Sequence, residues 1–226
     1  MHDGRLTALL HLCDSLFPTG SYAHSDGLEA ATASGLVATA AAVREWVASL
    51  LDETLAYTDG PAIALASEAF TERRWTDLRE LDDELNAQRP SSTSRDASRS
   101  IGTRLLTTWC RLHPHADLEA LVSSDRRDGW TLPVAFSAAS ASMQIDARTT
   151  MEAFMFTRIL SAASAAMRLM SLGQLEAHGI VADALARVPG VCDAVMLRRD
   201  RPSSFAPLAD IASMRQQYVT SRLFRS

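Results

Sequence analysis

The sequence has 226 residues, which fits one large globular domain or two small ones and excludes a long multidomain architecture. It contains 37 Ala and 28 Leu but only 10 Val and 6 Ile, and this excess of helix formers argues against an all-β or parallel-sheet fold. The basic residues are 22 arginines without any lysine, set against 27 acids, and the net charge of −5 argues against a nucleic-acid binder. We therefore expect an all-α protein.

Helical spacing of apolar residues predicts six helices in the first half of the chain, separated by proline, glycine or polar residues. They cover residues 5–16, 26–33, 40–57, 61–70, 75–88 and 95–112. In the fifth, the run Asp82, Asp83 and Glu84 could suggest a cation site, but consecutive helical residues point in different directions, so we expect a solvated face. Residues 90–94 are expected to be a polar loop within one bundle rather than a domain boundary.

The second half predicts five more helices, over residues 133–143, 149–171, 174–187, 192–199 and 208–218. Thr149 and Glu152 fit a capping box at the start of the helix over 149–171, which we expect to be the central one. The prediction is a single-domain all-α bundle of about 9–11 helices over residues 1–226. Its tail, residues 216–226, is expected to be flexible and disordered without a partner.

The sequence shows none of the usual signatures of an enzyme, a secreted protein or a membrane protein. A phosphate-binding GxxxxGK[ST] loop is impossible without lysine, and the GxGxxG, HExxH and GxSxG patterns are absent. The three cysteines are far apart, no long apolar signal segment opens the chain, and no run of 18 apolar residues occurs. We expect a cytoplasmic protein with no catalytic residues and no cofactor.

His113 and His115 could ligate a metal from a loop, since imidazole suits nickel, copper or zinc. Two histidines that flank a proline need further ligands from elsewhere, so the favoured interpretation is that both are structural or exposed. No metal site is predicted.

Two segments stand out from this helical pattern. In residues 17–29, glycine, serine, tyrosine and histidine crowd between two helices, and Gly20 and Gly27 allow the backbone to turn or to approach another segment closely. At the C-terminus, arginines alternate with Tyr218, Leu223 and Phe224. Exposed apolar residues at a chain end suggest a docking peptide that a partner covers.

The chain resembles the UreF family of urease accessory proteins at four places in the family order. Residues 9–29 read LLHLCDSLFPTGSYAHSDGLE, residues 131–136 read TLPVAF, residues 167–174 read MRLMSLGQ and residues 221–226 read SRLFRS. They are similar to the family's LLQLxDSxxPxGxFxHSxGLE opening, its LPVAF helix start, its VRLxPLGQ segment and its SRLFRS end. The chain departs from the pattern at Tyr22, at Asp26 and in Leu175–His178.

The resemblance implies an all-α, non-catalytic scaffold that assembles with UreD (also called UreH) and the GTPase UreG to insert nickel into apo-urease. It also implies a homodimer and contact with neither nucleic acid nor membrane. The partner-binding residues it suggests are Gly20, Ser21, Tyr22, His24, Ser25, Gly27, Glu29, Arg215, Tyr218, Ser221, Arg222, Leu223, Phe224 and Arg225. Leu223 and Phe224 are expected to fill apolar pockets of UreD, and Arg168, Gly173 and Gln174 to lie at a dimer or core interface.

Two other functions are compatible with the sequence. The protein could regulate GTP hydrolysis by UreG through an arginine near the nucleotide, which an arginine substitution that abolishes activation would show. It could instead carry nickel on His24, His113, His115 or the cysteines, which tight stoichiometric binding by the isolated protein would show.

Overall fold

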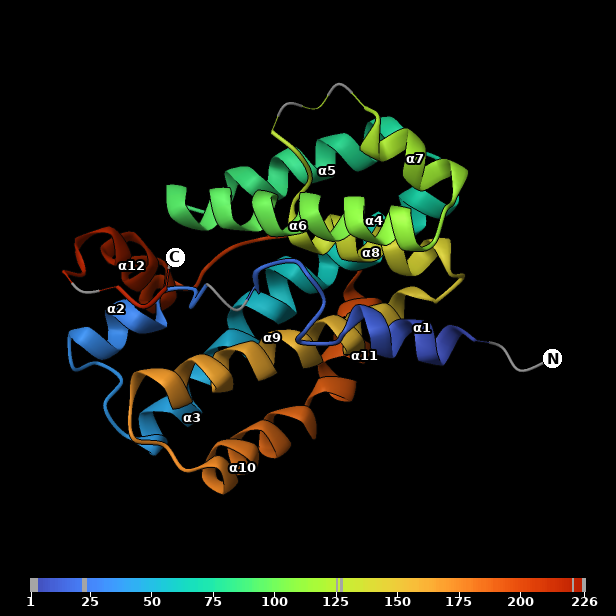
Figure 1. Ribbon diagram of the computed structural model, residues 1–226. Helices are drawn as coiled ribbons and strands as arrows, with labels where there is room; N and C mark the ends of the chain where they lie inside the picture. The colour runs from blue at the N-terminus through green and yellow to red at the C-terminus, as the bar shows by residue number, and fades with distance from the viewer. Residues whose placement is uncertain (1–3, 22–23, 125, 127, 221, 225–226) are drawn as a thin grey trace.

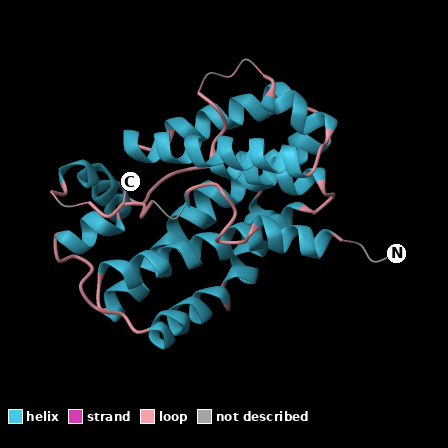
Figure 2. Cartoon of the chain, viewed as in Figure 1, coloured by secondary structure: helices cyan, strands magenta, loops and turns pink. Residues whose placement is uncertain are grey.

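Stripes of apolar residues three and four positions apart give each segment of this chain a face to bury, and the segments pack as a helical bundle (Figures 1 and 2). The computed structural model describes the chain except residues 1–3, 22–23, 125, 127, 221 and 225–226, and the described residues include no strand. The expectation of a single all-α domain is confirmed. No described helix is long and apolar enough to cross a bilayer.

The α-helices are α1 (Arg5–Leu12), α2 (Leu28–Ala33), α3 (Ala40–Ser49), α4 (Gly60–Thr71), α5 (Trp75–Ala87), α6 (Ser92–Leu112), α7 (Ala116–Val122), α8 (Leu132–Ser142), α9 (Ala147–Leu169), α10 (Gln174–Leu185), α11 (Val188–Arg198) and α12 (Pro207–Arg215). A π-helix, η2 (Leu50–Asp59), joins α3 to α4, and a 3₁₀-helix, η3 (Gln216–Tyr218), follows α12.

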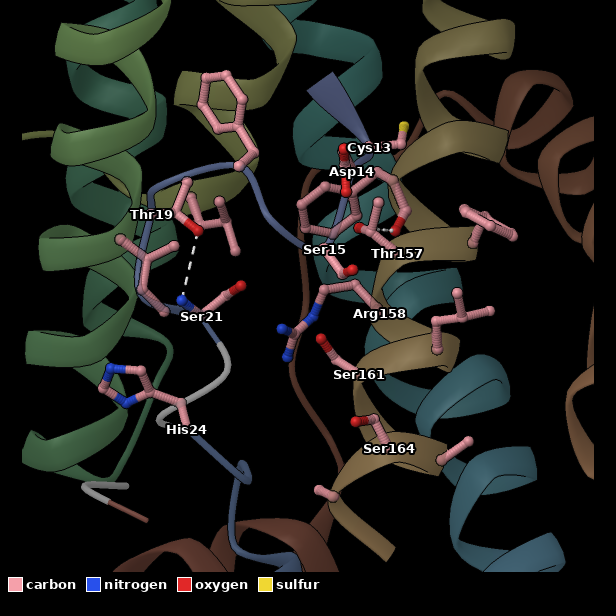
Figure 3. A pocket seen from close by; sticks show the side chains of 18 of the residues that line it. Cys13, Asp14, Ser15, Thr19, Ser21, His24, Thr157, Arg158, Ser161 and Ser164 are labelled. Atoms are coloured by element: carbon pink, nitrogen blue, oxygen red, sulfur yellow. Dashed lines mark hydrogen bonds between the residues drawn. The ribbon is translucent and has the colours of Figure 1, made fainter. Parts of the chain in front are cut away.

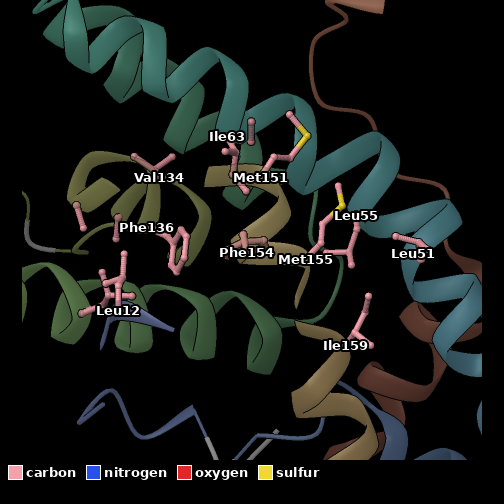
Figure 4. Packing of buried hydrophobic residues seen from close by; sticks show 14 of the residues in the cluster. Leu12, Leu51, Leu55, Ile63, Val134, Phe136, Met151, Phe154, Met155 and Ile159 are labelled. Carbon is pink, nitrogen blue, oxygen red and sulfur yellow. The ribbon is translucent and has the colours of Figure 1, made fainter. Parts of the chain in front are cut away.

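Helix α9 occupies the centre, as expected, and packs against α2, α3, α4, α8, α10 and α11. Its Phe154 meets Phe136 of α8 edge to face, with ring centroids 5.3 Å apart (Figure 4). Small side chains such as Ala135, Ala138 and Ala139 are fully buried in α8, which lets both α4 and α6 pack closely on it. The core therefore extends from α6 through α8 to α9.

The chain from α3 to α4 is one continuous helical run, whereas the sequence predicted a helix ending at residue 57 and a loop before Pro61. The structure keeps the helix by widening it to a π-helix ahead of the proline, which lacks an N–H to donate. Neighbouring groups take up the carbonyls of the widened turn: Arg198 donates to that of Ala56 (2.7 Å) and the Ser203 N–H to that of Tyr57 (2.9 Å). Hydrogen bonds from residues distant in sequence thus stabilise a continuous helix where the sequence predicted a loop.

Other predicted helix limits also need correction: α1 ends at Leu12, not at residue 16, and α11 begins at Val188, not at residue 192. Helix α9 begins at Ala147, not at Thr149, because the Asp146 carboxylate caps it and accepts from the N–H (2.9 Å) and hydroxyl (2.8 Å) of Thr149. The predicted capping box is wrong, since Glu152 pairs with Arg148 instead. Helix α6 begins at Ser92, within the predicted loop, and α7 was not predicted at all.

Asp82 is also placed differently from the prediction of a solvated face, because its side chain is fully buried. It lies on the inward face of α5 with Leu78 and Leu85, at helical spacing. One carboxylate oxygen accepts from the N–H (2.8 Å) and hydroxyl (2.6 Å) of Thr131, the residue that precedes α8. The adjacent Asp83 stays exposed. Asp82 therefore ties α5 to the start of α8.

Candidate partner-docking site where the loop after α1 meets the C-terminal tail

A cleft of about 520 Å³ lies between α9 and the loop that follows α1. Arg158, Ser161 and Ser164 stand on successive turns of α9 along one wall, and Ser21 and His24 lie on the loop opposite (Figure 3). The floor is apolar and comes from α6, α8 and α9. The cleft thus offers hydroxyl and charged groups at its sides and hydrocarbon beneath.

Arg158 organises the polar wall. It forms an ion pair with Asp26, a residue at which the chain departs from the family pattern. Burial alone would raise the pKa of Asp26, but the charge and hydrogen bond of Arg158 outweigh it and lower that pKa. The nearby Asp59 pairs with Arg89 (2.8 Å), although burial keeps the pKa of Asp59 raised. These alternating charges link the loop to α9 and to the π-helix.

Close backbone approach fixes the end of the loop. Gly27 precedes α2 with a φ of 87°, and a Cβ added there would lie 2.6 Å from the backbone nitrogen of Ser213 in α12. Ser213 in turn shares a 2.5 Å hydrogen bond with Ser94 at the start of α6. The expectation that Gly27 permits a close approach is confirmed, and the approaching segment is α12.

Glu29 joins the N-terminal segment to the C-terminal tail. Its side chain is buried in α2, and its carboxylate accepts hydrogen bonds from the backbone N–H groups of Leu223 and Phe224 and from the Gln216 amide. The fully buried Gln216 completes the connection by accepting from the N–H of Ala30 (3.2 Å). A buried carboxylate requires such donors, and here the tail provides them.

The Phe224 ring lies at the end of the cleft under a second arginine. Only 3% of Phe224 is exposed, and the Arg168 guanidinium lies 4.3 Å above the ring centre in a cation–π contact. We expected Phe224 to be an exposed anchor for a partner, and the structure places it in a pocket of its own chain instead. The sequence could not show this, because the pocket is made by helices distant from the tail.

All four segments that carry the family resemblance contribute to this cleft. Ser21 comes from the first, Phe136 from the second, Arg168 from the third and Phe224 from the fourth. The segment after α1 and the C-terminal tail thus meet where these segments converge.

The other predicted site residues are spread between the cleft and the surface. Gly20 is half-buried with a φ of 77°, and Ser25 is buried and accepts from the Glu29 N–H (3.4 Å). The exposed ones in and beyond α12 are Arg215, Tyr218, Arg222 and Leu223. Gly173 and Gln174 lie exposed at the start of α10 and do not line the cleft, whereas Arg168 does. Tyr22, Ser221 and Arg225 lie outside the described residues.

The two histidines considered as metal ligands have structural contacts. His113 stacks on Trp109 with ring centroids 4.0 Å apart, and burial, aided by the nearby His11, lowers the pKa of His113. His115 caps α7 by accepting from the Asp117 N–H (3.3 Å). Within the described part of the chain, no three histidine, cysteine or acidic side chains lie together in a group that could hold a metal ion.

Sequence reasoning missed Arg158. The helix over 149–171 was expected only to be the central one, so the charged residue within it received no role. The available signal was the spacing of Arg158, Ser161 and Ser164, which puts three polar side chains on one face of a buried helix.

Comparison with known proteins agrees with the motifs. The UreF family model matches residues 37–185. Three curated relatives, each called urease accessory protein UreF, align over almost their full length. The one from Actinobacillus pleuropneumoniae serotype 5b is 29% identical over 99% of this chain and 100% of its own. Those from Lachnoclostridium phytofermentans and Haemophilus influenzae strain PittEE are each 31% identical, over 99% and 98% of this chain and 100% and 95% of theirs. The chain therefore belongs to the UreF family, whose role is in urease maturation.

Proposed function

We propose that this protein is a cytoplasmic, non-catalytic scaffold that assembles with UreD (UreH) and the GTPase UreG and helps them insert nickel into apo-urease. The observation that carries the proposal is the convergence of the four family segments on one cleft, closed at its end by the chain's own tail. A cleft built from both chain ends is a surface that a partner can contact without disturbing the core.

The outer face of α12 supports a docking role for this end of the molecule. Leu208, Ile211 and Met214 recur every third residue and are each about half exposed, and Tyr218 in η3 is 78% exposed. Apolar residues at this spacing on an exposed helix are typical of a protein contact surface. We assign this face, with the exposed Arg215 and Arg222 beside it, to UreD.

Truncation after Tyr218 tests the proposal. It keeps Gln216 and its bond to Ala30 but removes Phe224 and the exposed arginine of the tail. The truncated protein, co-expressed with UreD and UreG from the same genome, should remain helical by circular dichroism but bind UreD more weakly on purification, because it keeps the α12 face and loses the ordered tail beside that face. Normal recovery of the three-protein complex would contradict the tail's role, and failure of the intact chain to bind either protein would contradict the scaffold itself.

We further propose that the protein forms a homodimer through the exposed face of α10. Leu175, beside Gly173 and Gln174, is 89% exposed, and nothing lies within 4 Å of a Cβ built at Gly173 or at the mid-helix Gly179. A glycine inside a helix costs about 1 kcal/mol relative to alanine. No neighbour within the described chain explains Gly179, whereas a second backbone approaching the helix would.

Leu175→Arg should therefore convert the dimer into a monomer in sedimentation velocity at micromolar concentration, because it places a charge at the centre of the proposed contact. Leu16→Arg is the matched control, since Leu16 is equally exposed, at 87%, but lies on the loop after α1. An unchanged dimer in the Leu175 variant would place the interface elsewhere.

A further inference from the structure

A second groove, of about 280 Å³, lies between α4, the residues that lead into α9, and the end of α11. It shares no lining residue with the cleft described above. Its floor is apolar and includes Leu65, Ile145, Val195 and Met196. Met196 is 36% exposed, so the floor can be reached from solvent.

The rim of the groove is acidic. Glu68 and Glu72 stand one helical turn apart at its α4 wall, Asp146 and Asp200 lie on the other segments, and Arg199 is the one basic residue that lines it. Arg74 bonds to both Glu68 (2.9 Å) and Glu72 (2.7 Å), and Arg198 pairs with Asp200 (3.3 Å), but all four rim carboxylates belong to exposed residues and remain open to a partner. An apolar centre with a charged, hydrated rim is the anatomy of a protein interface rather than of an enclosed small-molecule site.

A buried serine adds an independent indication of a ligand. Ser67 lines the groove and is only 5% exposed, yet its hydroxyl has no hydrogen-bond partner among the described residues. An unpaired buried hydroxyl is costly, and a donor that reached it would recover that cost. The adjacent Glu68 carboxylate would attract a donor that carries a positive charge.

We propose that this groove binds an amphipathic helical segment of a partner protein, with apolar side chains on its floor and lysine or arginine side chains on its acidic rim. The ammonium or guanidinium group of one of them pairs with Glu68, and the Ser67 hydroxyl, whose oxygen is closed to solvent in the free protein, turns toward that group and accepts a hydrogen bond from it. The rim also excludes an anionic membrane, because the same carboxylates repel it. This docking goes beyond the scaffold function, which uses the cleft and the tail.

The probe for the test is a fluorescein-labelled 18-residue helical peptide with a leucine stripe flanked by lysines. A second peptide has glutamate in place of each lysine. Fluorescence anisotropy should show binding of the lysine peptide alone, weakened by added salt. E68Q/E72Q should raise its Kd about fivefold, as expected for two partly exposed ion pairs. E119Q/D128N removes two exposed charges outside the groove and should leave the Kd unchanged.

Ser67→Ala separates docking from stability. Because the hydroxyl is unpaired in the free protein, its removal should leave the Tm unchanged or raise it, while the Kd of the lysine peptide rises about threefold. Equal binding of the two peptides, or equal Kd values for the groove and control variants, would overturn the proposal. The E68Q/E72Q variant should still form the complex with UreD and UreG, because the scaffold function uses the cleft and the tail. A failure of peptide docking can therefore be distinguished from a failure of the scaffold function.

Discussion

Replacing Glu29 with alanine should detach the C-terminal tail while the helical core stays folded. The substitution removes the acceptor for the Leu223 and Phe224 N–H groups and for the Gln216 amide. The Phe224 N–H and the Gln216 amide are buried beside it and the Leu223 N–H is partly buried, so the tail must either leave these donors unpaired or move into water, where they are satisfied. The buried Phe224 ring and its contact with Arg168 also hold the tail, and we expect the unpaired donors to outweigh that attachment, so that detachment is the lower-energy response.

The effect should be large, since a hydrogen bond to a charged group contributes roughly 1.5–3 kcal/mol. The loss of two or three such bonds should raise the exchange rates of the Leu223 and Phe224 amides by about 100-fold or more in hydrogen–deuterium exchange. Glu29→Gln keeps one acceptor oxygen, so its exchange rates should lie between those of the unchanged protein and the alanine variant. Glu176→Gln, an exposed acid in α10, is the control. Unchanged exchange in the alanine variant would show that Glu29 does not hold the tail.

Detachment should also weaken UreD binding. The docked tail presents Tyr218, Arg222 and Leu223 outward in a fixed arrangement, and a loose tail must be ordered again when the partner binds. We expect about a tenfold lower affinity for Glu29→Ala in a titration with purified UreD. An affinity equal to that of the unchanged protein would mean that UreD binding does not require the tail conformation that Glu29 stabilises.

The sequence predicted the helices well where a one-sided apolar pattern drives them. The pattern around α9 placed it at the centre, because a long helix with apolar residues on most of its surface has to be buried. Its first residue was predicted wrongly, since Asp146 and Thr149 are both good caps and it is the Asp146 carboxylate that accepts from the Thr149 N–H. The π-helix was beyond prediction, because Arg198 and Ser203, which satisfy its carbonyls, come from 140 or more residues away.

The candidate site was predictable as a set of segments but not as a contact. Gly27 and Glu29 were recognised within an unusual loop, and Phe224 within an unusual tail. Nothing in either segment indicates that the Glu29 carboxylate accepts from the tail's own backbone, because backbone N–H groups carry no sequence signature. For the same reason Phe224 was expected in a partner's pocket, although Arg168 covers it in this chain.

Asp82 is the site of the second large predicted effect, because it is the buried one of the two carboxylates that Arg99 and Arg126 contact. Arg99 and Arg126 approach its carboxylate at 3.1 and 2.5 Å, and their side chains are only 12% and 13% exposed. Removing one partner of a buried ion pair typically costs 3–5 kcal/mol, since the remaining charge is left without compensation. The Thr131 N–H and hydroxyl lose their acceptor as well. Asp82→Ala should therefore lower the free energy of unfolding by about 4 kcal/mol in urea denaturation followed by circular dichroism.

Asp83→Ala is the matched control, because Asp83 also contacts Arg99 and Arg126 but is 64% exposed, and exposed pairs contribute at most about 1 kcal/mol. Asp82→Asn keeps an acceptor for Thr131, so its loss of the free energy of unfolding should lie between those of the two alanine variants. The loss of the Asp82 carboxylate should also affect the cleft. Thr131 precedes α8, and Leu132 and Phe136 of α8 line the cleft. An equal loss of the free energy of unfolding in the alanine variants at 82 and 83 would contradict this prediction. It would mean that water already compensates the charges of the two arginines and that apolar packing alone holds α8 in place.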